Sequence, residues 1–80
     1  MSLRQIPGIG PKLEEDLRQL GYVSVSQLAG ADPEQMYQRL MQSHGTHIDR
    51  CVLYAFRCAV YYASNSDHDP ELLKWWKWKD

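Results

Sequence analysis

The chain has 80 residues, enough for one domain with a modest core. Its composition, 44% hydrophobic and 24% charged, is typical of a globular protein and not of a disordered tail. No apolar run approaches the roughly 20 residues of a membrane span, and no signal-peptide stretch follows Met1. A formal net charge of −1 excludes whole-surface attraction to nucleic acid. We expect a cytoplasmic protein that makes no contact with a membrane.

Proline and glycine punctuate the first quarter of the chain and predict two helices. A short helix near Leu3–Ile6 is expected to stop before Pro7, because proline disfavours helical geometry in the residue before it. A second helix begins at Pro11 and ends at Gly21. Its apolar stripe consists of Leu13, Leu17 and Leu20.

Capping patterns predict the next two helices. Ser24 and Gln27 have capping-box spacing for a short third helix that ends at Gly30. Asp32-Pro33 is the expected start of a fourth helix, which Gly45 closes. Met36 and Leu40 are its expected core residues.

The longest predicted helix spans His47–Ala63, with Thr46 as its N-cap, and a polar turn separates it from a last helix over 70–77. The long helix is apolar nearly all round, so a second element must cover it. We expect Leu72–Trp78 to provide this cover, with self-association as the alternative. One stripe should comprise Ile48, Cys51, Val52, Ala55, Cys58, Ala59 and Tyr62, and further apolar residues are Leu53, Tyr54, Phe56, Val60 and Tyr61.

An internal repeat relates two parts of the chain. At an offset of 22 residues, Ile6–Pro11 aligns with Leu28–Pro33, so that Gly8 matches Gly30. Gly10 is replaced by Asp32 and Lys12 by Glu34, and these acids would repel a phosphate. We expect two helix-hairpin-helix units packed face to face, of which the second is degenerate.

The Pro7–Gly10 hairpin has the chemistry of a phosphate site. Glycine at 8 and 10 permits positive φ and leaves no Cβ to block a ligand. Since Pro11 starts the next helix, the amides of Gly10, Lys12 and Leu13 should face an anion at the positive end of the helix dipole. The candidate phosphate-binding residues are Arg4, Gly8, Ile9, Gly10, Lys12 and Leu13.

The segment from Leu3 to Leu13, with Leu17 and Leu20-Gly21 behind it, resembles the helix-hairpin-helix motif of DNA repair and recombination proteins. The resemblance implies that the hairpin amides hold the DNA backbone without reading its sequence.

The whole chain also resembles the bacterial pathogenicity-locus (Cdd) family, some members of which are labelled putative mitomycin resistance proteins. The matching segments are Ile6–Pro11, Gly30–Pro33, Asp49–Tyr54, Phe56–Tyr61 and Leu72–Trp76. The family name refers to genetic context and implies no biochemical activity.

Other candidate sites have simpler structural interpretations. His44, His47 and Cys51 lack the fourth ligand of a closed zinc site and the orienting group of a catalytic Cys–His pair, so we expect no metal, cofactor or catalytic residue. Cys51 and Cys58 lie on the order of 10 Å apart in a helix, too far to bridge, and should be buried thiols.

Two charged segments also admit simple interpretations. Glu14, Glu15 and Asp16 form an acidic run interpreted as a solvated first turn, in which Glu14 pairs with Arg18. The segment Trp75–Trp78 is expected to pack on the domain, with single-stranded nucleic acid and a protein partner as the alternatives.

Together, these patterns predict one all-α domain over residues 1–80 with five to six helices, in a tandem helix-hairpin-helix or SAM-like arrangement. Its parts are a first unit over 3–21, a degenerate second unit over 24–43, a central helix over 47–63 and a C-terminal helix over 70–77. The predicted function is non-enzymatic, weak and sequence-independent DNA binding. The alternative is a protein-interaction adaptor, and a homodimer or a protein partner is expected to strengthen either function.

Overall fold

A computed structural model describes residues 3–79 of the chain. Three α-helices carry the fold: α1 (Pro11–Gln19), α2 (Pro33–His44) and α3 (Arg50–Ser64). Four 3₁₀ segments lie around them, namely η1 (Leu3–Gln5), η2 (Val25–Leu28), η3 (Pro70–Leu73) and η4 (Trp75–Trp78). The described residues contain no strand, which confirms the all-α class.

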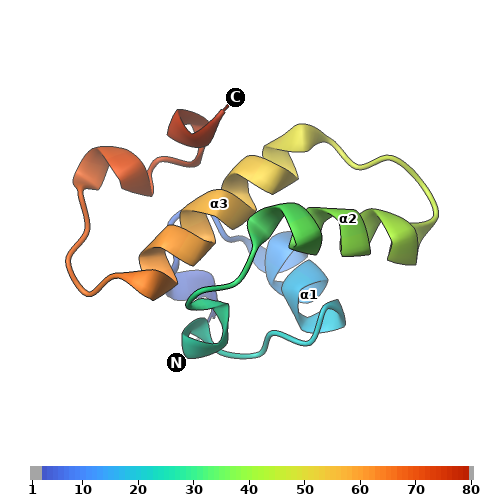
Figure 1. Ribbon diagram of the computed structural model, residues 1–80, viewed down its shortest axis with the longest axis horizontal. Helices are drawn as coiled ribbons and strands as arrows, with labels where there is room; N and C mark the ends of the chain where they lie inside the picture. The colour runs from blue at the N-terminus through green and yellow to red at the C-terminus, as the bar shows by residue number, and fades with distance from the viewer. Residues whose placement is uncertain (1–2, 80) are drawn as a thin grey trace.

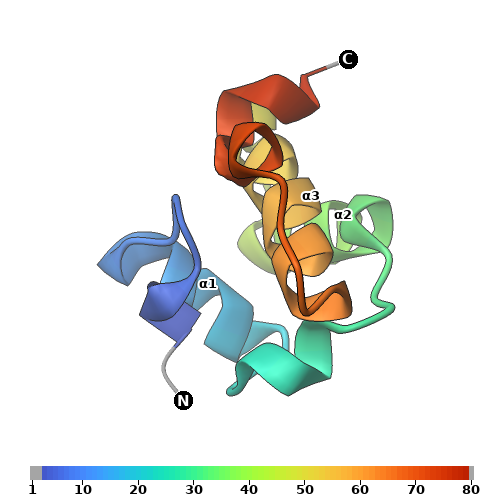
Figure 2. The same cartoon turned by 90° about the vertical axis from the view of Figure 1, so that its left-hand side faces the viewer.

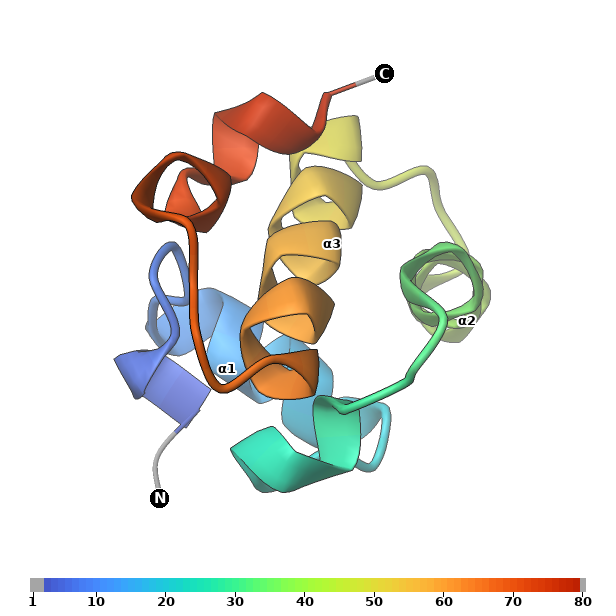
Figure 3. The same cartoon turned by 60° about the vertical axis from the view of Figure 1, so that its left-hand side comes forward.

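Helix α3 runs through the middle of the molecule (Figure 3). It packs against α2 on one side and against η3 and η4 on another. The segment η2, which precedes α2 in the chain, also packs against α3. Figure 1 shows α1 crossing behind the pair formed by α2 and α3. The segment after α3 folds back along it, so the C-terminal end of the chain lies beside the helix (Figure 2).

One apolar core joins η1, α1, η2, α2 and α3. Phe56 and Leu53 of α3 are fully buried members of this core. The other buried members of the core are Leu3, Ile6, Ile9, Leu17, Leu20, Val25, Leu28, Met36, Tyr37, Leu40 and Ala59. Of the residues expected to face inward, Leu17, Leu20, Met36 and Leu40 are buried, and Leu13 is partly buried against the core.

The prediction of five to six helices is wrong, because only three of the predicted segments form α-helices. The two short segments before Pro7 and after Ser24 form 3₁₀ turns of three and four residues. The predicted helix over 70–77 is two 3₁₀ segments separated at Lys74, which is extended at φ −92° and ψ 115°. Runs this short cannot offset the cost of nucleating an α-helix, so they adopt the tighter turn.

The start of the longest helix also differs from the prediction. Helix α3 begins at Arg50 and not at His47, since the N-cap is Asp49 and not Thr46. The Asp49 carboxylate accepts a hydrogen bond from the Cys51 backbone N–H at 2.9 Å. The predicted stripe is wrong at Cys51, which is exposed, whereas Leu53 and Phe56 from outside the stripe are buried.

Three predicted boundaries of the earlier segments are confirmed, at Ser24, Asp32 and Gly45. The expected capping box of Ser24 and Gln27 is present, and the Gln27 side chain accepts a hydrogen bond from the Ser24 backbone N–H at 3.2 Å. Helix α2 begins at Pro33 behind Asp32 and ends at Gly45, whose φ of 67° is left-handed. No helix within residues 3–79 is long and apolar enough to cross a membrane.

Candidate functional site

The beginning of α1 has backbone N–H groups that the protein itself does not use. Gly10 occupies the N-cap position and has no side chain to accept them, and no other described side chain caps this helix. Pro11 contributes no N–H, and within residues 3–79 we find no acceptor for the N–H groups of Lys12 and Leu13. An uncapped helix start is a ready site for an anion.

The two glycines of the hairpin have different backbone conformations. Gly8 has a φ of 88°, in the region that favours glycine. Gly10 has a φ of −96° and a ψ of −173°, an extended conformation that any residue adopts. The expectation of positive φ at both positions is thus wrong for Gly10, where the missing Cβ instead leaves open space within 4 Å.

The predicted phosphate-binding residues fall into two groups. Gly8, Lys12 and Leu13 lie together on one groove, and the Lys12 side chain is 78% exposed. Ile9 is 5% exposed and anchors the turn in the core, so its side chain is not available to a ligand. Arg4 is exposed on η1 and is not among the residues that line the groove.

The groove has a volume of about 460 Å³ and lies between α1, the first half of α3 and Trp75. From α3 it is lined by Cys51, Val52 and Ala55, preceded by Ile48. Lys12 and Asp16 are its only charged lining residues among those the structure describes. Its walls are therefore mainly apolar, and its charged groups lie on the α1 side.

Asp16 is buried, contrary to the prediction of a fully solvated acidic turn. Its side chain is 7% exposed, and its Oδ1 has no hydrogen-bond donor among the described residues. Two side-chain nitrogen atoms lie near it, Lys12 Nζ at 3.8 Å and His44 Nε2 at 4.0 Å. The other part of the prediction is confirmed, because Arg18 lies 3.7 Å from Glu14.

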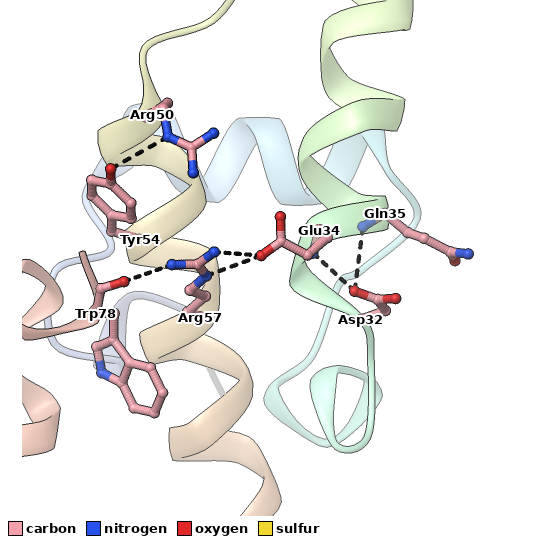
Figure 4. A network of polar contacts seen from close by, with 7 residues as sticks. All are labelled: Asp32, Glu34, Gln35, Arg50, Tyr54, Arg57 and Trp78. Atoms are coloured by element: carbon pink, nitrogen blue, oxygen red, sulfur yellow. Dashed lines mark hydrogen bonds and ion pairs between the residues drawn. The ribbon is translucent and has the colours of Figure 1, made fainter. Parts of the chain in front are cut away.

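The corresponding start of α2 is already occupied. Asp32 Oδ1 accepts hydrogen bonds from the backbone N–H groups of Glu34 at 2.9 Å and Gln35 at 3.4 Å (Figure 4). The Glu34 carboxylate accepts from the Arg57 guanidinium, whose Nε lies 3.1 Å away. This helix start is both capped and acidic.

The C-terminal segment packs on the domain, as predicted. Trp78 donates its ring N–H to the Leu72 carbonyl at 2.8 Å and lies 5.5 Å from the Tyr61 ring, centroid to centroid. Trp75 lies so close to Gly8 that a Cβ built on this glycine would meet Trp75 Cδ1 at 3.3 Å. Trp76, in contrast, is 49% exposed and lies outside the groove lining.

The two cysteines have different environments, so the prediction that both are buried is wrong for Cys51. Cys58 is buried, and this burial raises the pKa of its thiol. Cys51 is exposed on the groove, where partial desolvation is the main cause of a raised pKa. No group of three or more potential metal ligands occurs within residues 3–79.

Sequence reasoning overlooked the groove, although one signal for it was present. Leu13, Asp16, Leu17 and Leu20 follow the spacing i, i+3, i+4 and i+7, so Asp16 lies on the apolar face of α1. A carboxylate in that position is an anomaly that points to a partner. No comparable pattern announces that Trp75 would lie against Gly8, because 67 residues separate them in the chain (75 − 8).

A comparison with protein-family models matches residues 1–80 to the family Cdd1, described as "Pathogenicity locus". The chain belongs to the Cdd1 family. This confirms the family resemblance over the full length, whereas the description mentions neither a helix-hairpin-helix motif nor mitomycin resistance. Neither the curated proteins nor the solved structures contain a match to this Cdd1 chain.

Proposed function

We propose that this Cdd1 protein is a non-enzymatic module that binds DNA through its phosphate backbone, independently of sequence. The observation that carries the proposal is the uncapped start of α1. In this proposal, residues 3–21 form a helix-hairpin-helix unit, and residues 24–43 form a second unit that has lost the phosphate chemistry.

The backbone N–H groups of Lys12 and Leu13 donate hydrogen bonds to the oxygens of one DNA phosphate. The N–H of Gly10 donates to the same phosphate. Three features support this arrangement. The open space beside Gly10 admits a ligand to the backbone, the helix dipole favours an anion there, and Lys12 adds an exposed charge. Gly8 and Ile9 shape the turn, and Arg4 supplies a further exposed cation on η1.

The affinity of one copy is expected to be low. Contacts to two or three phosphates give a shallow dependence on salt, with a log–log slope of roughly −2, and non-specific dissociation constants of about 10⁻⁴–10⁻⁶ M are typical. The formal net charge of −1 adds no general attraction. A homodimer, or tethering to a DNA-bound protein, would raise the affinity because two sites would engage together.

A salt titration of DNA binding tests the proposal. The wild type and the double variant Gly10→Asp, Lys12→Glu, which reproduces the charges of the second unit, are compared on duplex and single-stranded DNA. We expect the variant to lose at least about tenfold in affinity and about one unit of salt slope, because a phosphate contact is removed.

The control variant carries the same change of net charge away from α1. Gln38→Glu, Gln42→Glu and Ser66→Asp alter three exposed positions on α2 and in the turn after α3. The control should bind DNA within about twofold of the wild type if contact and not net charge decides affinity. Equal binding by the wild type and the Gly10→Asp, Lys12→Glu variant refutes the proposal.

The second candidate function is a protein-interaction adaptor that uses the same fold without DNA. The mainly apolar groove favours it, because such surfaces bind partners. The adaptor predicts no DNA binding above background at low salt. It also predicts that the Gly10→Asp, Lys12→Glu variant still binds a protein partner whose contacts do not include Lys12.

A further inference from the structure

The groove beside α1 has the size and the lining of a ligand site. Its volume of about 460 Å³ lies within the range of roughly 300–1,000 Å³ that small-molecule sites occupy. Val52 and Ala55 form an apolar wall, and Trp75 contributes an aromatic ring. A ligand with a flat, weakly polar body would bury its faces against these surfaces.

The polar groups are arranged along one helix. At one position lie the unbonded N–H groups at the start of α1, together with the Lys12 side chain. One helical turn further on lies Asp16, at a rise of about 6 Å from Lys12. The groove therefore offers an anion site next to an apolar slot and then a hydrogen-bond acceptor.

Asp16 is the strongest sign of a missing partner. Its side chain is 7% exposed and its Oδ1 has no hydrogen-bond donor among the described residues. Lys12 Nζ at 3.8 Å and His44 Nε2 at 4.0 Å lie within reach of electrostatic attraction but beyond hydrogen-bond distance. A buried acceptor without a donor is costly. Oδ1 is covered by protein, so a rotation of the Asp16 side chain, which lines the groove, would bring the carboxylate to an N–H group of a ligand.

We propose that the groove binds an unpaired base of single-stranded DNA, whose phosphate lies at the start of α1. This inference rests on the proposed function, and it names the form of DNA that the site prefers. The nucleotide supplies each feature the groove lacks: an anion for the α1 amides, a flat ring for the apolar walls and Trp75, and an edge that hydrogen-bonds to Asp16.

The carboxylate favours some bases over others. Adenine, cytosine and guanine carry exocyclic amino groups that donate to a carboxylate, and cytosine N4 is a common partner of aspartate and glutamate. Thymine has no amino group, and its only Watson–Crick donor, N3–H, is flanked by two carbonyl oxygens that the Asp16 carboxylate repels. Lys12, which lies between the phosphate position and Asp16 in the chain, offsets the repulsion between these two negative groups.

A protein segment is a poorer match to the same groove. A cationic side chain could pair with Asp16, but it would leave the uncapped amides of α1 without an anion. Only an occupant that carries both an anion and a hydrogen-bond donor, spaced by about one helical turn, uses the whole site.

The test measures the binding of the full chain to labelled oligonucleotides of about eight nucleotides by fluorescence anisotropy. Oligo(dC) is expected to bind at least about fivefold more tightly than oligo(dT), since one good base contact discriminates by this much or more. Asp16→Asn should abolish the preference, because the amide donates to thymine carbonyls as well as accepting from cytosine. It should not weaken binding to a duplex of the same length.

The Trp75→Leu variant tests the aromatic wall, with Trp76→Leu as its matched control. Trp76 is the neighbouring residue and lies outside the groove lining. We expect Trp75→Leu to lose about fivefold or more on either single strand, and Trp76→Leu to stay within about twofold. Circular dichroism establishes that each variant is folded before it is compared.

Protection of Cys51 in the wild-type protein provides a measurement that needs no variant. Cys51 lines the groove and is exposed, while Cys58 is buried, so a maleimide at about pH 8 should label Cys51 first. Saturating oligo(dC) is expected to slow this labelling at least about fivefold, and duplex DNA much less, because only an unpaired base enters the groove.

Two results overturn the inference. One is equal affinity for oligo(dC) and oligo(dT), and the other is unprotected Cys51 at saturating oligonucleotide. If duplex binding still depends on Gly10 and Lys12 in either case, the proposed function survives and only the base site is wrong. If the Gly10→Asp, Lys12→Glu variant binds every DNA as the wild type does, both proposals fail.

Discussion

The starts of α1 and α2 follow the same local plan but differ in one capping residue. Each helix begins at a proline, and each is preceded by a left-handed glycine, Gly8 with φ 88° and Gly30 with φ 75°. The residue before the proline is Gly10 in α1 and Asp32 in α2. Asp32 bonds the amides of its own helix, whereas those of α1 remain unbonded.

This difference shows that a capping side chain and an anionic ligand compete for the same backbone groups. A carboxylate at the N-cap stabilises the helix and at the same time fills the position that a phosphate would take. The sequence of α1 gives up part of the stabilisation and keeps the amides available. Helix α3 follows α2 in this respect, with Asp49 as its cap.

Substituting Gly8 and Gly30, the left-handed glycines that precede α1 and α2, should produce the largest difference between the two helix starts. Gly8→Ala is expected to destabilise the protein by about 2 kcal/mol, because a left-handed alanine costs about 1–2 kcal/mol and its Cβ presses on Trp75. Gly30→Ala has open space around it and should cost only about 1 kcal/mol. Urea unfolding followed by circular dichroism measures the stability of both variants. Equal losses of stability would show that Trp75 moves away from the new Cβ without cost.

Removing the cap of α2 should have the next largest effect. Asp32→Ala eliminates two hydrogen bonds to the helix and is expected to cost about 1 kcal/mol. Asp32→Asn keeps an acceptor and serves as the control, with a loss of a few tenths of a kcal/mol. If both variants unfold at the same urea concentration as the wild type, the cap of α2 does not contribute to stability.

The cap of α3 should make a small, pH-dependent contribution. The backbone hydrogen bond from Cys51 lowers the pKa of Asp49 below its ordinary value of 3.8. Its stabilising effect is therefore present above about pH 3.8 and is lost as the pH falls through the lowered pKa. The difference in stability between the wild type and Asp49→Asn should therefore shrink as the pH falls through this acidic range. Thermal melts at a series of pH values measure that difference. A gap independent of pH contradicts the assignment.

The smallest effect on stability is expected where the proposed effect on function is largest. Gly10→Asp introduces a cap at a position with suitable extended geometry and free space, so stability should rise by only a few tenths of a kcal/mol. The same variant should lose DNA affinity, because its carboxylate occupies the α1 amides. If the variant is more stable but binds DNA as the wild type does, DNA does not bind at the start of α1.

Much of the architecture was predictable from local patterns. The starts of α1 and α2, the closing Gly45 and the inward leucines were expected from proline, aspartate and apolar spacing, because these signals act within one helical turn. The short segments at 3–5 and 70–78 were expected as helices and form 3₁₀ turns. Their pattern suits either geometry. The segment at 3–5 is too short for an α-helix, and the extended Lys74 divides 70–78 into two pieces of four residues each.

The candidate site was predictable only in part. Gly10, Lys12 and Leu13 could be placed at a helix start from the sequence, and the uncapped amides agree with that placement. The exposure of Cys51 was predicted wrongly, since it depends on which faces of α3 other elements cover. The positive φ expected at Gly10 was also wrong, because an N-cap residue ordinarily has an extended backbone. The buried stripe predicted for α3 was wrong because a helix that is apolar nearly all round does not show which of its faces will be buried.

The sequence by itself determined the uncapped start of α1. Gly10 followed by Pro11 cannot cap a helix in any tertiary context, because neither residue carries a side-chain acceptor. Only the tertiary structure decided that a groove lies beside this start, with Asp16 buried and Trp75 against Gly8. Hydrogen bonds at a helix end involve neighbours in the chain, whereas burial and cavities depend on surfaces that meet after the whole chain has folded.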